Sequence, residues 1–225
     1  MPEDSTTEKG WYMEIELKYK VPDKKTMDKI WADEYVSGME EKDTREDILM
    51  KAAYFDTEDR ILSKNNIAFR VRMEGKKTVG SLKWDDTDSG IQGLHSREEI
   101  NVPIKDDKCF ISPSPAIFAQ SPEGRDLLEV VEDSPLLNYL EMTFVRKRVR
   151  LDNGDCICEL SLDDGKIICD SGEAPISEME IELFTGSQDE LIKIGKAFEE
   201  KYNLKPEVKS KYSRGLDLLK SCEKK

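Results

Sequence analysis

The sequence is poor in the residues that bind zinc or form disulfide frameworks. It has one histidine and five cysteines, and no two cysteines are spaced as C-x-x-C. Zinc sites and disulfide-linked secreted folds depend on such residues, so neither is expected here. The two nearest cysteines, Cys156 and Cys158, are expected to share one face of a strand and to pack as reduced thiols, as in a cytoplasmic protein.

The sequence also lacks a long apolar run and a targeting signal. No stretch approaches the roughly 20 apolar residues that a membrane-spanning helix needs. Residues 1–10 are polar and acidic, whereas a secretion signal is basic and then apolar. We therefore expect a cytoplasmic protein without a membrane partner.

The net charge of −13 argues against a nucleic-acid partner. Binding to a duplex usually needs a basic face that displaces counterions. The chain nevertheless contains 35 lysine and arginine residues, so where they gather is informative. Its 225 residues, 37% of them hydrophobic, are enough for one sizeable core, and we expect a single domain over residues 1–225 with its core at about 12–219.

Alternating apolar and polar residues predict a chain made mostly of short strands. The dipeptides Asn153-Gly154 and Asp164-Gly165 are typical of hairpin turns. Helices are expected over about 22–42, 126–131 and 134–139, over 187–203 behind a capping box of Ser187 and Glu190, and near the end of 208–219. The expected strands are Trp11–Val21, Ala53–Asp56, Ala68–Met73, Val79–Trp84, Ser96–Pro103, Thr143–Leu151, Asp155–Asp163, Gly165–Asp170 and Ser177–Phe184.

Several of these strands gather charge on one face. Side chains alternate across a strand, so Glu14, Glu16 and Lys18 share a side. A solvated outer face is the ordinary explanation for one such strand. Here, however, arginine-rich and glutamate-rich strands are separate elements, which favours a binding surface that lines a concavity. The other charged faces hold Arg70 and Arg72; Arg97 and Glu99; Arg146, Arg148 and Arg150; Glu159 and Asp163; and Glu178, Glu180 and Glu182.

These residue types suit phosphate chemistry. The planar guanidinium of arginine binds phosphate oxygens in pairs and stays charged when partly desolvated. Carboxylates two residues apart on a strand can hold a hard divalent cation and leave positions for water and phosphate. Cations and a metal together are the usual means of phosphoryl transfer.

An ordered set of motifs resembles the CYTH superfamily of triphosphate tunnel enzymes. The segment Glu14-Ile15-Glu16-Leu17-Lys18 resembles its ExExK signature, and the segment 93–99 is similar to that of bacterial inorganic triphosphatases. The resemblance spans about 12–219. The other matching segments are Tyr54-Phe55-Asp56-Thr57, Ala68 to Arg72, Ser81-Leu82-Lys83, Glu159 to Asp163, the strand with Glu178, Glu180 and Glu182, and Ser210 to Gly215.

The resemblance implies an α+β fold with a closed eight-stranded antiparallel β-barrel flanked by helices, and hydrolysis of inorganic triphosphate to pyrophosphate and phosphate. It implies Mg²⁺ or Mn²⁺ held by Glu14, Glu16, Glu180 and Glu182. The implied phosphate-binding residues are Lys18, Arg70, Arg72, Lys83, Arg97, Arg146, Arg148 and Lys211. The implied catalytic residues are Glu16 and Lys18, with Glu99, Glu159 and Asp163 as candidates for a second metal or for positioning water.

The sequence leaves alternatives open. Asn101 and Ser161 stand where the family pattern favours acids, and Arg150, Glu178 and Lys209 lie near strand ends, where solvated side chains are equally expected. The same lining would meet thiamine triphosphate, ATP or longer polyphosphate. A class IV adenylate cyclase and a non-catalytic polyphosphate or nucleotide sensor also fit, and the oligomeric state is expected to be monomer or homodimer.

Overall fold

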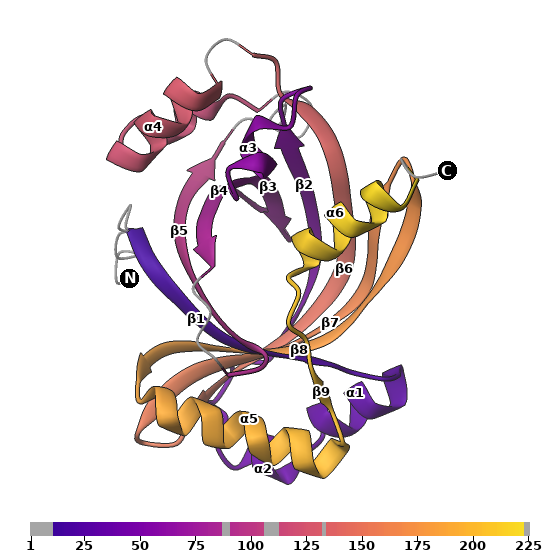
Figure 1. Ribbon diagram of the computed structural model, residues 1–225. Helices are drawn as coiled ribbons and strands as arrows, with labels where there is room; N and C mark the ends of the chain where they lie inside the picture. The colour runs from indigo at the N-terminus through magenta and orange to yellow at the C-terminus, as the bar shows by residue number, and fades with distance from the viewer. Residues whose placement is uncertain (1–10, 87–90, 106–112, 132–133, 223–225) are drawn as a thin grey trace.

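The computed structural model describes residues 11–86, 91–105, 113–131 and 134–222 (Figure 1). The strands are β1 (Trp11–Lys20), β2 (Glu46–Asp56), β3 (Ala68–Glu74), β4 (Lys77–Asp86), β5 (Leu94–Ile104), β6 (Leu137–Asp152), β7 (Cys156–Cys169), β8 (Gly172–Gly186) and β9 (Lys205–Pro206). The helices are α1 (Lys24–Trp31), α2 (Glu34–Ser37), α3 (Ile61–Lys64), α4 (Pro122–Val131), α5 (Gln188–Tyr202) and α6 (Lys211–Cys222), with a short 3-10 helix η2 (Pro115–Phe118).

The strands form one strongly curled antiparallel sheet. They follow the order β5-β4-β3-β2-β6-β7-β8-β1-β9, and β5 also pairs with β1. Figure 1 shows the long strands β6, β7 and β8 sweeping around one side of the molecule and β2 to β5 standing on the other. The curled sheet and flanking helices agree with the expected α+β architecture.

The sheet is not the closed eight-stranded barrel that the sequence predicts. Among the described residues it has nine strands, because the two-residue β9 adds to β1. The two sides of the resulting half-barrel are joined by the pairing of β2 with β6 and, at the other edge, through β1, which pairs with β5 from Trp11 to Leu17 and with β8 from Glu16 to Lys20. The two pairings overlap only at Glu16 and Leu17, so neither β5 nor β8 runs along the whole of β1.

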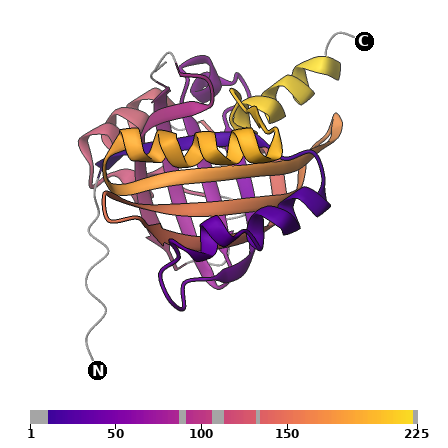
Figure 2. The same ribbon diagram turned by 90° about the horizontal axis from the view of Figure 1, so that it is seen from below.

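One side of the sheet packs its outer face against α1, α2 and α5 (Figure 2). Leu17 on β1 and Ile181 on β8 meet Ile30 of α1 and Phe198 of α5, and all four are at most 2% exposed. Burial of side chains of this size contributes about 1.5–3 kcal/mol each. The helices thus cover the apolar faces and leave the charged faces of these strands pointing inward.

The opposite side is covered by α3, α4 and η2. Phe69 of β3 packs edge-on against Phe118 of η2, with ring centroids 5.4 Å apart. Val71 of β3 and Leu62 of α3 are fully buried in the same cluster. Phe69 and Val71 therefore face outward, and Arg70 and Arg72, which alternate with them, face the interior of the curl.

Two local expectations are wrong for reasons that lie across the sheet. β7 continues through Asp164 and Gly165 instead of turning there, and a Cβ on Gly165 would lie 2.2 Å from the Thr143 carbonyl oxygen of β6. The glycine permits close strand approach rather than a turn. The helix expected over 134–139 is absent because β6 begins at Leu137, where it pairs with Asp56 of β2.

Other local expectations are confirmed. Gly154 has φ +88° in the turn between β6 and β7, and the Ser187 hydroxyl accepts a hydrogen bond from the Glu190 amide at the start of α5. Cys156 and Cys158 are free, buried and on the same face of β7. The helix expected over 22–42 is divided into α1 and α2. Within the part of the chain that the structure describes, every helix is too short or too polar to cross a membrane.

Candidate active site

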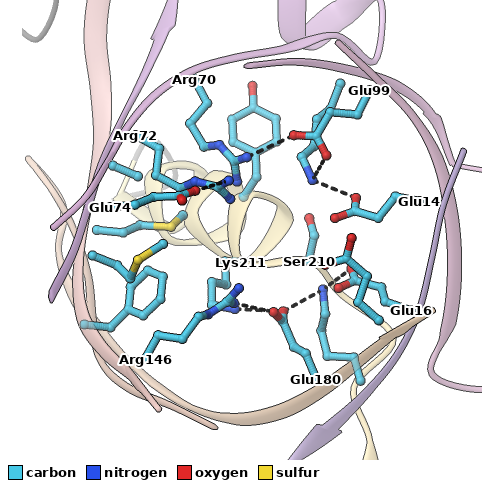
Figure 3. Close-up of a pocket in the computed structure, with 18 of the residues that line it drawn as sticks. Glu14, Glu16, Arg70, Arg72, Glu74, Glu99, Arg146, Glu180, Ser210 and Lys211 are labelled. Carbon is cyan, nitrogen blue, oxygen red and sulfur yellow. Dashed lines mark hydrogen bonds and ion pairs between the residues drawn. The ribbon is translucent and has the colours of Figure 1, made fainter. Parts of the chain in front are cut away.

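The inward faces of the curled sheet surround a cavity of about 220 Å³. Every strand from β1 to β8 contributes to its lining, and α6 with the preceding Ser210 adds the rest. Figure 3 looks into this cavity and shows charged groups from opposite strands converging on its centre. The charged residues that alternate along each strand in the sequence are thus the ones whose side chains line the cavity.

The structure brings together all but two of the site residues that the sequence predicts. Asp163 lies behind the lining, and only the backbone of Arg97 belongs to the described part of the structure. The residues that line the cavity are Glu14, Glu16, Lys18, Arg70, Arg72, Lys83, Glu99, Arg146, Arg148, Glu159, Glu180, Glu182 and Lys211.

One network of charges joins β1, β3, β4 and β5. Lys83 Nζ lies 2.7 Å from Glu14 Oε2 and 2.9 Å from Glu99 Oε2, and Arg70 Nη2 lies 3.1 Å from Glu99 Oε1. Glu99 is 1% exposed. Burial opposes its ionisation, but Lys83, Arg70 and Arg72 outweigh burial and lower its pKa to about 2. Glu99 is therefore suited to holding two cations in place and poorly suited to accepting a proton.

A second network centres on Glu180 of β8. Its carboxylate contacts Lys18 at 3.2 Å, Arg146 at 2.5 Å and Lys211 at 2.8 Å. Burial alone would raise the pKa of Glu180, yet Lys211, Lys18 and Arg146 hold it well below its ordinary value. These contacts gather three phosphate-binding candidates from three elements around one carboxylate (Figure 3).

Asp163, Glu178 and Glu180 place carboxylate oxygens within 4.8 Å of one another, as a metal site would. The ammonium group of Lys211 already lies among these carboxylates. Its Nζ contacts all three residues, at 2.7 Å from Asp163 and 2.8 Å from Glu180. Asp163 is fully buried and accepts two 2.7 Å hydrogen bonds from Arg146. Its position suits the orientation of Arg146 and Lys211.

Glu14, Glu16 and Glu182 form a second group of carboxylates on the cavity lining, outside the closely spaced cluster of Asp163, Glu178 and Glu180. Glu16 and Glu182 are register partners on β1 and β8, and Glu14 is two residues along on the same face. Burial first, and then repulsion from Glu14 and Glu16, raise the pKa of Glu182 to about 8. Among the described side chains Glu182 makes no ion pair. Carboxylates crowded in this way match the hard oxygen donors that Mg²⁺ and Mn²⁺ prefer.

A comparison with known protein families agrees with this fold and with the order of the charged motifs along the chain. The family model of the CYTH domain matches residues 13–216. This chain belongs to the CYTH domain family. The motifs on β1, β3, β5 and β8 that resemble the superfamily thus lie within one matched domain.

Relatives of this CYTH domain include a curated inorganic triphosphatase from Haemophilus influenzae. The two are 29% identical over 146 residues, which is 65% of this chain. The match covers 39% of the Haemophilus protein, so the chain spans less than half of the length of that relative.

Solved structures share the fold of this CYTH domain. A candidate adenylyl cyclase from Hippeastrum, which has a dominant triphosphatase activity, superposes with a TM-score of 0.69 at 20% identity over 91% of this chain and 95% of that chain. A candidate adenylate cyclase from Bacillus halodurans gives a TM-score of 0.56 at 20% identity over 91% and 98% of the two chains. At these identities the likeness establishes the fold alone.

The cavity of this CYTH domain includes residues that sequence reasoning did not select. Glu74 keeps the parity of Arg70 and Arg72 on β3, so extending that pattern by two residues would have found it. Behind the lining, Glu178, for which a solvated position was equally expected, is fully buried against Lys211 and Arg214. The further lining residues are Met50, Ala52, Tyr54, Ala68, Met142, Phe144, Phe184, Ser210 and Tyr212.

The two residues near strand ends that were weighed with Glu178 lie at the surface. Arg150 has a side chain that is 47% exposed and pairs with Glu41 at 3.4 Å. The side chain of Lys209 is 53% exposed and pairs with Asp217. Parity alone did not separate these residues from Glu178, because Arg150 lies near the end of β6 and Lys209 lies between β9 and α6, outside any strand.

Proposed function

We propose that this domain hydrolyses inorganic triphosphate to pyrophosphate and phosphate with the help of Mg²⁺ or Mn²⁺. The observation that carries the proposal is the single cavity in which cations from several strands lie beside the carboxylates of Glu14, Glu16 and Glu182. The inorganic triphosphatase of Haemophilus influenzae, similar over part of its length, supports the choice of substrate.

The cations of the cavity would hold the phosphate chain. Arg70, Arg146 and Lys211 are each anchored by a buried carboxylate, so little side-chain freedom is lost when an anion binds. Burial opposes the charge on Lys211, but Asp163, Glu178 and Glu180 raise its pKa above the ordinary value and keep it cationic. The further phosphate-binding candidates are Lys18, Arg72, Lys83, Arg97 and Arg148.

The carboxylates of Glu14, Glu16 and Glu182 would hold the metal. A divalent cation there would neutralise charge that develops on phosphate oxygens during the reaction. Glu180, which the sequence placed in the same set, would also position Lys18, Arg146 and Lys211, because its oxygens contact them.

Hydrolysis needs a water molecule aligned with the terminal phosphorus. An oxygen–phosphorus bond to water forms while the bridging bond breaks, and pyrophosphate leaves with the electron pair. The proton lost by water would pass to a cavity carboxylate. Glu159 is our candidate, since it lies 3.6 Å from Arg148 in an ion pair and accepts a 3.3 Å hydrogen bond from the Ser161 hydroxyl.

The test is phosphate release from inorganic triphosphate, ATP and thiamine triphosphate, each with Mg²⁺, Mn²⁺ or a chelator. Glu182→Gln removes one proposed ligand, and Glu173→Gln is a matched control on the same strand, with a side chain that is 54% exposed. We expect metal-dependent release from inorganic triphosphate, a loss of at least about 100-fold in Glu182→Gln, and an unchanged rate in the control.

Each alternative has its own outcome in this assay. Cyclic AMP formed from ATP would identify a cyclase, and preferred turnover of thiamine triphosphate would identify a thiamine triphosphatase. Binding of triphosphate by folded protein without release from any substrate would overturn the hydrolase proposal in favour of a sensor.

A further inference from the structure

Glu74 places a carboxylate among the cations of the cavity at a position where a phosphate would be expected. It lines the cavity from the end of β3 and pairs with Arg72, two residues earlier on the same face. Figure 3 shows its carboxylate against the guanidinium group of Arg72 and directed inward. The pair is half-buried, with side-chain exposures of 21% for Glu74 and 20% for Arg72.

The surroundings of Glu74 are strongly cationic. Burial opposes its ionisation, but Arg72, Arg70, Arg146 and Arg148 together lower its pKa below the ordinary value. Among the described side chains, the Nε groups of Arg70 and Arg72 are buried without a hydrogen-bond partner. Unmatched donors of this kind are rare in proteins. The arginines around Glu74 thus have more donor capacity than the protein itself uses.

Glu74 also lies at a defined place along the cavity. Arg70 is the register partner of Tyr54, whose ring stacks on Tyr212 of α6 at 4.8 Å between centroids. Glu74 is the partner of Met50, four residues further along β3, or roughly 13 Å at the usual rise of a strand. Glu74 therefore lies further along β3 than Arg70, which is beside the contact of Tyr54 with α6.

We propose that Glu74 sets the length of the phosphate chain that the cavity accepts, because its carboxylate occupies the position on Arg72 that a further phosphate would take. A short chain held between Lys211 and Arg70 leaves this carboxylate in place. A longer polyphosphate extending along β3 meets a like charge and must displace it. This inference rests on the proposed function in one respect, that a phosphate chain is the ligand.

The experiment measures binding without turnover. Affinities for inorganic triphosphate and for a long-chain polyphosphate are determined by calorimetry in the presence of a chelator. Wild type is compared with Glu74→Gln and with Glu173→Gln, which removes the same charge outside the cavity. We expect wild type to prefer triphosphate, and Glu74→Gln to gain about tenfold in affinity for the long chain relative to triphosphate. The control should keep the wild-type ratio.

A wild-type protein that binds both ligands equally, or a Glu74→Gln ratio equal to that of the control, would overturn the inference. If Glu74→Gln does not fold, Glu74→Asp shortens the carboxylate and should give a smaller gain in the same direction, whereas an unchanged ratio would refute the role. Failure of hydrolysis would count against the proposed function and would leave this binding ratio unaffected.

Discussion

At the scale of single residues, the buried charges of the cavity depend on a few cations that each contact several carboxylates. Lys211 is the strongest case, since it contacts Asp163, Glu178 and Glu180. Removing one partner from a buried ion pair costs about 3–5 kcal/mol, because the remaining charge stays uncompensated. Lys209, two residues earlier, makes an exposed pair with Asp217 instead.

Replacement of Lys211 with glutamine should therefore lower the free energy of unfolding by about 3–5 kcal/mol at pH 7. Lys209→Gln is the matched control and should change it by at most about 1 kcal/mol, since exposed pairs contribute little. Urea denaturation of both variants measures the difference. Equal stabilities would show that the three carboxylates do not depend on Lys211.

The thiol of Cys158 gives a second prediction at this scale. Burial raises its pKa to about 12, with a smaller contribution from Cys156. The thiolate is the form that alkylating reagents attack, so Cys158 should resist iodoacetamide at pH 8, while the half-buried Cys169 reacts first. Peptide mapping by mass spectrometry reads both sites, and unfolded protein is the control in which both react. Early labelling of Cys158 in folded protein would contradict its placement in the core.

At the scale of elements, Asp33 ties the first helices to α5. Its carboxylate accepts a hydrogen bond from the Tyr35 amide at the start of α2, and it contacts Lys201 Nζ at 2.7 Å and the Tyr202 hydroxyl. The aspartate is 5% exposed. Although burial opposes ionisation, the hydrogen bonds from Lys201, Tyr202 and Tyr35 lower the pKa of Asp33.

Asp33→Ala should reduce stability by about 1–3 kcal/mol at pH 7. A carboxyl group with a lowered native pKa stabilises the fold above its unfolded pKa of about 4 and loses that contribution as pH falls through the native value. The difference between wild type and variant should accordingly shrink as pH is lowered from 5 toward 2. Urea titrations across this range test it, and a difference independent of pH would show that the charge has no role.

The elements also show which features the sequence could predict. Strand parity identified most of the cavity lining, because alternation is fixed by the backbone wherever a strand is regular. The dipeptide Asp164-Gly165 gave a wrong turn prediction, because the glycine is needed for the close approach of the β6 backbone beside it. The helix expected at Ser134 failed for a similar reason, since pairing with β2 overrides a local capping signal. A local sequence pattern carries no information about which strand will lie beside it.

At the scale of the whole molecule, a chain of net charge −13 holds a cavity rich in lysine and arginine. Inorganic triphosphate bound there should stabilise the fold, by about 2.7 kcal/mol at a concentration 100 times its dissociation constant. Thermal unfolding with and without triphosphate measures the shift, and inorganic phosphate at equal concentration is the control. No shift with triphosphate would contradict the cavity as its binding site.

The curl of the sheet followed from parity, whereas the bridging role of β1 depends on pairings between distant segments.

The double pairing of β1 has a consequence for how the molecule is made. Glu16 and Lys18 are synthesised well before their partners Glu182 and Glu180, which lie on β8 more than 150 residues later. At translation rates of roughly 5–20 residues per second, β1 waits on the order of ten seconds or more before β8 has been synthesised. During that interval β1 carries an unpaired edge, and the site residues of β1 gain their β8 neighbours only after this delay.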